Sequence, residues 1–177
     1  MFKNKEINLI VAVTKNGAIG RNGGLACRSK TDMKYFKDKT LGSVVIMGRN
    51  TFESMGSRPL PERINFVVTS KVGKDSESLI FCDSIEKTLC QSVMDYPEKD
   101  IWIIGGEKVY RHCLDQGWVD KAYITEIDTV VEDASAWFDM EKLEKEGWAL
   151  DKMTTTKDEE SGISLKFFIL KKENDKF

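Results

Sequence analysis

An apolar run that ends in glycine and passes directly into a helical pattern occurs twice in this chain. Residues 44–47 lead into Gly48 and Arg49, and residues 101–104 lead into Gly105 and Gly106. A strand that feeds a helix in this way leaves the first amide N–H groups of the helix free, and the helix dipole makes that end positive. Such junctions bind anions, and Arg49 adds a fixed positive charge to the first one. Two junctions in one chain predict a ligand with two phosphates, such as a dinucleotide.

The composition excludes several classes of protein. Of the 177 residues, 41% are hydrophobic and 32% are charged, and this length suits one domain, residues 1–177, with its own core. The net charge of −2 argues against nucleic acid as a partner. The apolar runs fall short of the ~20 residues needed to cross a bilayer, and the first residues are too polar for a signal peptide. We therefore expect a monomeric, cytoplasmic protein with no membrane partner.

The cysteines do not have the spacing of a metal site. Four of them are spread singly along the chain, and they are Cys27, Cys82, Cys90 and Cys113. Without an export signal, the simplest interpretation is free thiols. We predict no bound metal.

Strand and helix patterns alternate along the chain. Continuous apolar runs, suited to strands buried on both faces, lie at residues 7–13, 44–47, 65–68 and 101–104. Helical patterns lie at residues 31–39, 51–55, 84–93 and 107–114. Residues 122–128 and 163–171 carry strand patterns with no helix between them long enough for a regular crossover. The sequence predicts a single α/β domain, with a mostly parallel central sheet, flanking helices and an antiparallel C-terminal hairpin.

Polar segments mark the expected turns. Asn16-Gly17 and Asn22-Gly23-Gly24 are turn signals on either side of a short apolar stretch. The charged residues 157–160 and 171–176 are interpreted as a solvated turn and a solvated tail.

Asp32 is the most informative acidic residue. It opens a helical pattern on the side of the predicted sheet where open α/β folds bind ligands. A carboxylate in the first turn of a helix is often only a cap. The neighbours expected around this one are apolar, and they are Leu25, Met33, Phe36 and Met55. Partial desolvation would shift the carboxyl toward its protonated form and allow it to pair with a flat, amidine-like donor edge.

Several motifs, in family-like order and spacing, together resemble the dihydrofolate reductase family. The resemblance runs from Ile7 to about Phe138, with a weaker tail. The motifs are residues 7–12, 18–20, Asp32 with Phe36-Lys37, residues 45–54, Arg58 to Pro61 with Arg63, residues 103–106 with Tyr110, and residues 123–125. This resemblance implies the family's fold and the NADPH-dependent reduction of 7,8-dihydrofolate to 5,6,7,8-tetrahydrofolate.

The resemblance also implies roles on the substrate side. Asp32 is similar to the family's acidic residue that grips the 2-amino and N3 edge of the pterin, with Thr125 as its hydroxyl partner. Leu25 and Tyr110 complete the implied catalytic set. Arg63 is similar to the arginine that pairs with the α-carboxylate of the folate glutamate, a contact suited to a guanidinium fork. The other implied substrate contacts are apolar: Ile10, Val11, Met33, Phe36, Met55, Leu60 and Ile104.

On the cofactor side, the resemblance assigns NADPH to the two glycine junctions. Gly105-Gly106 is where the family has an unusual cis peptide. Thr69, Ser70 and Lys71 look like the pocket that, with the arginine of the first junction, selects the 2′-phosphate of NADPH over NADH. The full implied set is Ala12, Ile19, Gly20, Gly48, Arg49, Asn50, Thr51, Thr69, Ser70, Lys71, Gly105, Gly106, Glu107, Lys108, Val109 and Tyr110.

Two departures from the family pattern lie next to the implied site. Ala26-Cys27 stands where these enzymes usually have Pro-Trp, so we expect a smaller, softer wall and a wider pocket. Glu62 stands where the family commonly has glycine, and we expect it to pair with Arg63 and weaken glutamate binding.

The implied mechanism is hydride transfer from the nicotinamide to pterin C6, with N5 protonated by a water route and Asp32 polarising the ring. Antifolate inhibitors are expected ligands of the same pocket. Two alternatives stay open. One is a reductase of the same fold that acts on another pterin-like or ribityl-pyrimidine substrate, which the loss of tryptophan at Cys27 keeps open. The other is a protein that binds NADPH or folate without turnover.

Overall fold

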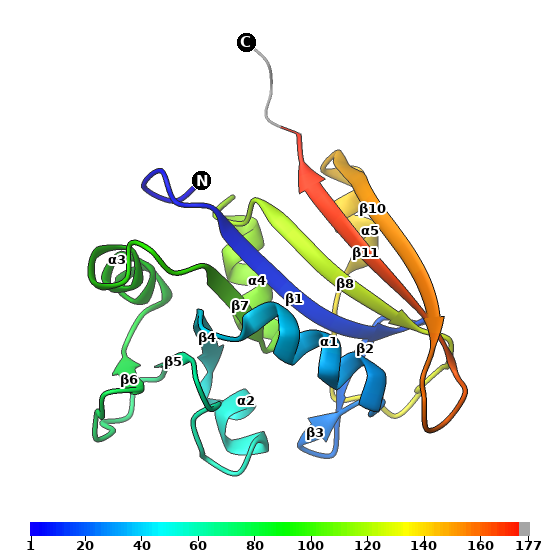
Figure 1. Ribbon diagram of the computed structural model, residues 1–177, viewed down its shortest axis with the longest axis horizontal. Coiled ribbons are helices and arrows are strands. Elements are labelled where there is room, and N and C mark those ends of the chain that lie inside the picture. The colour runs from blue at the N-terminus through cyan, green and yellow to red at the C-terminus, as the bar shows by residue number, and fades with distance from the viewer. Residues whose placement is uncertain (174–177) are drawn as a thin grey trace.

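A twisted eight-stranded sheet runs through the middle of the molecule (Figure 1). The computed structural model describes residues 1–173. In chain order the elements are β1 (Ile7–Thr14), β2 (Ala18–Arg21), β3 (Gly24–Leu25), α1 (Lys30–Thr40), β4 (Val44–Gly48), α2 (Arg49–Ser54), β5 (Ile64–Val68), β6 (Leu79–Cys82), α3 (Ile85–Asp95), β7 (Ile101–Gly105), α4 (Glu107–Asp115), β8 (Lys121–Ile127), β9 (Ala136–Trp137), α5 (Met140–Lys145), β10 (Trp148–Lys157) and β11 (Ser164–Lys172).

The strand order of the sheet is β10-β11-β8-β1-β7-β4-β5-β6. From β8 to β6 every neighbouring pair is parallel, whereas β11 pairs antiparallel with both β8 and β10. The predicted α/β fold, with a mostly parallel sheet and an antiparallel C-terminal hairpin, is therefore confirmed.

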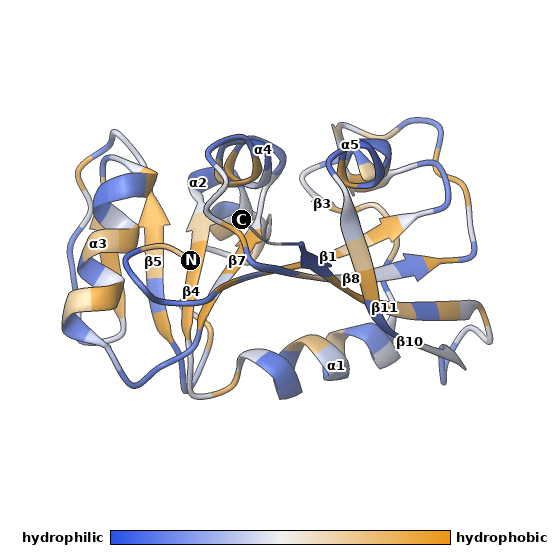
Figure 2. Cartoon of the chain, turned by 90° about the horizontal axis from the view of Figure 1, so that it is seen from above, coloured by the Kyte–Doolittle hydropathy of each residue, from blue (hydrophilic) through white to orange (hydrophobic). Residues whose placement is uncertain are grey.

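The two faces of the sheet are covered by different helices. Side chains alternate between the faces along each strand, so Leu9 and Val11 of β1 join the larger core with residues of α3, α4 and α5, whereas Ile10 joins a second cluster with Phe36 of α1. Figure 2 shows α1 on one side of the sheet and α3, α4 and α5 on the other. The candidate site lies on the α1 side, near the carboxyl ends of the parallel strands.

The sequence patterns missed β6, β10, α5 and a small second sheet of order β3-β2-β9. β10 is an edge strand of mostly exposed lysine and threonine side chains, so it has no apolar run to reveal it. β3 and β9 have two residues each, and α5 has six. Elements this short carry too little periodicity to be recognised.

The turn predictions have mixed outcomes. Gly17, Asn22 and Gly23 all have positive φ, at 85°, 50° and 75°, as the turn signals predicted. The solvated turn predicted at residues 157–160 is wrong at Asp158, which is only 3% exposed because it binds the start of α1. Of the predicted tail, Lys171 and Lys172 belong to β11, and residues 174–176 lie outside the described residues.

The helices within residues 1–173 are all too short or too polar to span a membrane. Cys27, Cys82, Cys90 and Cys113 are free thiols.

Candidate active site

Asp32 lies in the first turn of α1 and faces Thr125 of β8. The helix begins here because Ser29 is its N-cap and its hydroxyl oxygen accepts a hydrogen bond from the Asp32 amide at 3.1 Å. Burial raises the pKa of the Asp32 carboxyl above its ordinary value of 3.8, and the Thr125 hydroxyl acts in the opposite direction. The predicted desolvation is thus present, and the carboxyl keeps its proton to a higher pH than a free aspartate.

Most of the predicted apolar substrate residues form one wall beside Asp32. Residues from β1, β7, α1 and the segment after α2 share a hydrophobic cluster, namely Ile10, Phe36, Met55, Leu60 and Ile104. Met33 is 41% exposed on α1. The Val11 side chain, which was predicted to contact substrate, does not belong to this wall. Strand alternation turns it into the core on the opposite face of the sheet. Only the main chain of Val11 can face this wall.

Arg63 is buried, and two hydrogen bonds fix the orientation of its side chain. Its Nε donates to the Pro61 carbonyl at 2.9 Å, and its Nη1 donates to the Thr40 hydroxyl at 3.0 Å. The expected pairing with Glu62 is wrong: within residues 1–173 no salt bridge joins these two side chains. Glu62 is exposed and has a positive φ of 57°, whereas the Arg63 side chain turns inward. Burial lowers the pKa of Arg63, although the Glu62 charge opposes this shift.

The two other predicted catalytic residues differ in how firmly they are held. The Tyr110 hydroxyl donates to the Ile10 carbonyl at 2.7 Å, and complete burial raises its pKa well above the ordinary value. Tyr110 is therefore neutral and fixed, on the face of the sheet that α4 covers. Leu25 ends the two-residue strand β3 and is 57% exposed. Its side chain is therefore not packed into the apolar cluster that holds Phe36 and Met55.

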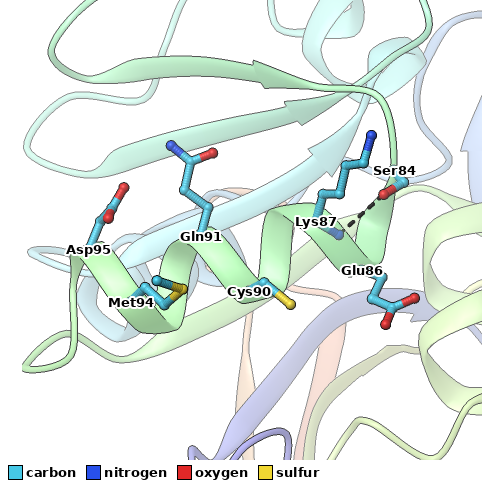
Figure 3. Close-up of a pocket in the computed structure, with 7 residues that line it drawn as sticks. All are labelled: Ser84, Glu86, Lys87, Cys90, Gln91, Met94 and Asp95. Carbon is cyan, nitrogen blue, oxygen red and sulfur yellow. Dashed lines mark hydrogen bonds between the residues drawn. The ribbon is translucent and has the colours of Figure 1, made fainter.

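The two glycine junctions differ from the other helix starts of the described chain. α2 and α4 begin after Gly48 and Gly106, and neither start has a side-chain cap. In contrast, α3 is capped by Ser84, which accepts from the Lys87 amide at 3.1 Å (Figure 3). A serine and an aspartate likewise cap α1 and α5. The amide donors of α2 and α4 are thus left for an external anion.

These two helix starts lie side by side. β4 and β7 are parallel neighbours, with Met47 opposite Gly105. A Cβ on Gly48 would lie 3.9 Å from the Gly106 amide nitrogen, and a Cβ on Gly105 or Gly106 would lie 3.1 Å from the Thr51 hydroxyl oxygen. The Gly105-Gly106 peptide is cis, as the resemblance implied. Because glycine has no side chain at these three positions, the free amides at the starts of α2 and α4 can lie close together.

The predicted phosphate-selective residues lie at the same edge. Gly48 pairs in register with Val68, so Arg49 and Thr69 follow the ends of neighbouring strands. The Arg49 Nε is 2.6 Å from a Glu53 carboxylate oxygen, and the Thr69 hydroxyl accepts from the Lys71 amide at 3.2 Å. The structure therefore brings a guanidinium, a hydroxyl and the exposed Ser70 and Lys71 to one side of the glycine junctions.

The remaining predicted cofactor residues come from four elements. Ala12 lies on β1, whereas Ile19 and Gly20 lie on β2. Glu107 pairs with Arg111 at 3.0 Å, and Val109 would contact a side chain placed on Gly48. Asn50 and Lys108 are exposed on α2 and α4.

The hollow along α3 is separate from this region. It has a volume of about 480 Å³ and is lined by Ser84, Glu86, Lys87, Cys90, Gln91, Met94 and Asp95 (Figure 3). The sequence predicted a binding role for none of these residues. Residues 1–173 also contain no cluster of histidine, cysteine and acidic side chains suited to a metal ion.

The sequence also matches a known protein family over most of its length. The dihydrofolate reductase family profile matches residues 6–172, which is nearly the whole described chain. The chain belongs to the dihydrofolate reductase family.

Similar proteins support this membership of the dihydrofolate reductase family. The chain is 35% identical to the dihydrofolate reductase of Buchnera aphidicola subsp. Acyrthosiphon pisum, over 93% of this chain and 98% of that protein. It is 36% identical to the Haemophilus influenzae enzyme, over 92% and 96%. It is also 35% identical to a bifunctional dihydrofolate reductase-thymidylate synthase of Paramecium tetraurelia, of which it spans 27%. Among solved structures, the Enterococcus faecalis dihydrofolate reductase complexed with NADP(H) and RAB-propyl matches with a TM-score of 0.81 and 26% identity, over 96% of this chain and 97% of that chain.

The departure from the dihydrofolate reductase pattern at Ala26-Cys27 lies close to Asp32. Ala26 is buried, and its amide donates to the Ile19 carbonyl at 3.1 Å. Cys27 is half-buried, and burial is the main reason that its thiol pKa is raised, with the charge of Asp158 adding to the shift. The thiol is therefore neutral at neutral pH, and both the softer wall and the wider pocket remain predictions.

Proposed function

We propose that this chain catalyses the NADPH-dependent reduction of 7,8-dihydrofolate to 5,6,7,8-tetrahydrofolate. The observation that supports this most strongly is Asp32, a half-buried carboxyl beside the Thr125 hydroxyl and an apolar wall. A pterin presents a flat donor edge that a carboxylate can bind through two oxygens, and its ring fits between apolar side chains. The relatives that match most of the chain carry the same activity in their names.

The proposed cofactor is NADPH, which when bound supplies the hydride. The residues present fit it: the uncapped starts of α2 and α4 offer amide donors to its phosphates, and Gly105 and Gly106 leave no side chain in the way. We assign Arg49, Thr69 and Lys71 to the adenosine 2′-phosphate, which NADH lacks. The Enterococcus faecalis relative is a complex with NADP(H).

The chain itself would orient the pterin and control one proton. Asp32 accepts hydrogen bonds from the 2-amino and N3 edge, and the Thr125 hydroxyl holds that carboxyl in place. Burial disfavours an isolated negative charge on Asp32, so the ionised carboxylate and the positive charge that the pterin ring gains when N5 takes up a proton stabilise each other. Phe36 and Ile104 exclude water from the ring faces. Ordering both reactants in this way removes most of the entropic barrier to transfer at C6.

Replacing Arg63 by lysine tests the proposed glutamate contact. We expect the KM for dihydrofolate to rise about tenfold while kcat changes little, because a charge-assisted hydrogen bond contributes about 1.5–3 kcal/mol and lysine cannot form the same fork. The Pro61 and Thr40 contacts that hold Arg63 would also be lost. Arg58→Lys, an exposed change in the same loop, is the control and should leave KM unaltered. Equal KM values for Arg63→Lys and the parent would remove Arg63 from the substrate site.

The reaction itself is tested by following NADPH absorbance with purified protein, with and without dihydrofolate. Oxidation that depends on dihydrofolate, with tetrahydrofolate as product, supports the proposal. NADPH binding by calorimetry with no oxidation supports instead a protein that binds without turnover. Oxidation that appears only with another pterin or a ribityl-pyrimidine supports the second reductase, which Cys27 keeps open.

Three further features are proposed together with this function. Antifolates that present a similar donor edge are proposed to bind Asp32 in place of dihydrofolate. A monomer is proposed, since the site draws all its predicted residues from one chain. We also place the protein in the cytoplasm, because reducing compartments keep thiols such as its four free cysteines unpaired.

A further inference from the structure

The turn between β10 and β11 lies beside the start of α1 and binds it (Figure 1). Its Asp158 is only 3% exposed. One carboxylate oxygen of Asp158 accepts from the Ser29 hydroxyl at 2.7 Å and from the Thr31 amide at 3.0 Å. Ser29 and Asp158 are 129 residues apart in the chain. A single carboxylate thus joins the C-terminal hairpin to the helix that carries Asp32.

The second oxygen of Asp158 is held within its own turn. It accepts from the Ser161 amide at 2.8 Å, from the Ser161 hydroxyl at 2.9 Å and more weakly from the Glu160 amide at 3.3 Å. These donors keep the pKa of Asp158 well below its ordinary value, with the Ser29 hydroxyl as the largest cause. The carboxylate is therefore charged at neutral pH and fixed at both oxygens.

Glu159, the next residue of the turn, makes two further contacts with the start of α1. The Thr31 hydroxyl accepts from the Glu159 amide at 2.8 Å, and the exposed Lys30 and Glu159 side chains lie 3.8 Å apart. The first turn of α1 is thus bound by side-chain and main-chain groups of Asp158 and Glu159.

Ser29 connects this contact to Asp32. A hydroxyl has one proton to donate, and Ser29 gives it to Asp158. Its oxygen is then directed at the Asp32 amide, which donates to it at 3.1 Å. Because Ser29 is itself only 4% exposed, no solvent competes for this proton. The orientation of the Asp32 main chain therefore depends on a carboxylate in the last hairpin.

We propose that Asp158 is a positioning residue for Asp32: through Ser29 and Thr31 it fixes the first turn of α1, and so the direction from which the Asp32 carboxyl meets the substrate. The proposal rests on the reductase function proposed above for the role of Asp32. Its contact network, however, exists independently of substrate. The last hairpin is thus part of the active-site framework, although it contributes no group that touches the reacting atoms.

The first test is Asp158→Asn, which keeps the size of the side chain but replaces one acceptor oxygen with a donor. We expect single-turnover hydride transfer at saturating NADPH and dihydrofolate to slow by about 10- to 100-fold, since small misplacements of catalytic groups have effects of this size. The dissociation constant for NADPH should stay the same, because the glycine junctions follow β7 and β4, which β8 and β1 separate from the β10-β11 hairpin in the sheet. Glu160→Gln, an exposed charge change in the same turn, is the matched control and should behave as the parent.

A second variant separates position from charge. Ser29→Ala keeps Asp158 charged but cuts its connection to Asp32, so it should slow hydride transfer to a similar extent. If both variants act through one connection, the double variant should be little slower than the slower single variant. Rates are measured below the unfolding transition of each variant, so that loss of folded protein is not counted as loss of turnover.

A readout that needs no turnover completes the test. Titration of the Asp32 carboxyl by carbon NMR should show its raised pKa falling toward 3.8 in both variants, as a loosened first turn lets water reach the carboxyl. If the parent fails to reduce dihydrofolate, the reductase function fails, but this titration still decides whether Asp158 positions Asp32. Parent-like rates and a parent-like Asp32 titration in folded Asp158→Asn and Ser29→Ala would overturn the proposal.

Discussion

Replacing Asp32 by asparagine is expected to remove most turnover at neutral pH while making the folded protein more stable there. Asparagine has nearly the same shape but can neither carry the negative charge nor exchange a proton. The rate contribution of a positioned acid or base is typically 10²–10⁴-fold, so we expect kcat to fall about 100-fold or more. The Ser29 cap should survive, because it uses the main-chain amide of this residue.

The stability gain follows from the raised pKa of Asp32. A carboxyl whose pKa is higher in the folded state than in the unfolded state binds its proton more tightly when folded. Stability of the parent therefore falls as the pH rises from the ordinary value of 3.8 through the raised value, because the folded carboxyl must then become charged in a half-buried site. The asparagine side chain stays neutral at every pH, so the advantage of Asp32→Asn should be absent in acid and present at neutral pH.

Urea unfolding of parent and variant near pH 3.8 and at neutral pH measures this difference, and stopped-flow NADPH oxidation measures the rate. Asp38→Asn is the matched control, since it makes the same chemical change at an exposed position of the same helix. Turnover at the parent rate in Asp32→Asn would exclude Asp32 from the mechanism. A variant that is inactive but no more stable at neutral pH would show that burial of Asp32 does not oppose folding.

The sequence was sufficient for features that depend on local pattern. Continuous apolar runs predicted β1, β4, β5 and β7, because strands buried on both faces need them. The glycine junctions could also be predicted, since a strand, a glycine and a helix follow one another directly in the chain. The burial of Asp32 could be predicted because its apolar neighbours are close in sequence or in familiar motifs, and its role in the site stays a prediction.

The errors arose where side-chain direction or a distant contact decides the outcome. Asp158 lies among charged residues and has the pattern of a solvated turn, yet its partner Ser29 is 129 residues away, and nothing local indicates it. Glu62 and Arg63 are adjacent in sequence, but the positive φ of Glu62 and the inward turn of Arg63 separate their charges. Val11 could have been assigned correctly, because strand alternation places it opposite Ile10.

Replacing Gly105 by alanine is expected to weaken both the fold and cofactor binding. Gly105 has a φ of +136°, which costs an L-residue about 1–3 kcal/mol. The new Cβ would also lie 3.1 Å from the Thr51 hydroxyl oxygen, so the Thr51 side chain must shift by a few tenths of an ångström, whereas the Tyr110 hydroxyl at 3.5 Å is in ordinary contact. We expect the free energy of unfolding to fall by about 1–3 kcal/mol. The dissociation constant for NADPH should rise more than tenfold, since the added methyl group lies at the junction where the free amides of both helices converge.

Two other glycines separate the causes of this effect. Gly23→Ala changes a residue at φ +75° with open space around its Cβ, so it should lower stability through backbone strain and leave NADPH binding unchanged. Gly106→Ala meets the same Thr51 oxygen at 3.1 Å but has an ordinary φ of −98°, so it should weaken NADPH binding with less loss of stability. Urea unfolding and calorimetric titration with NADPH measure the two quantities independently. Parent-like NADPH affinity in both Gly105→Ala and Gly106→Ala would mean that the junction between α2 and α4 does not hold the cofactor phosphates, and the anion site would then have to be sought away from these two glycines.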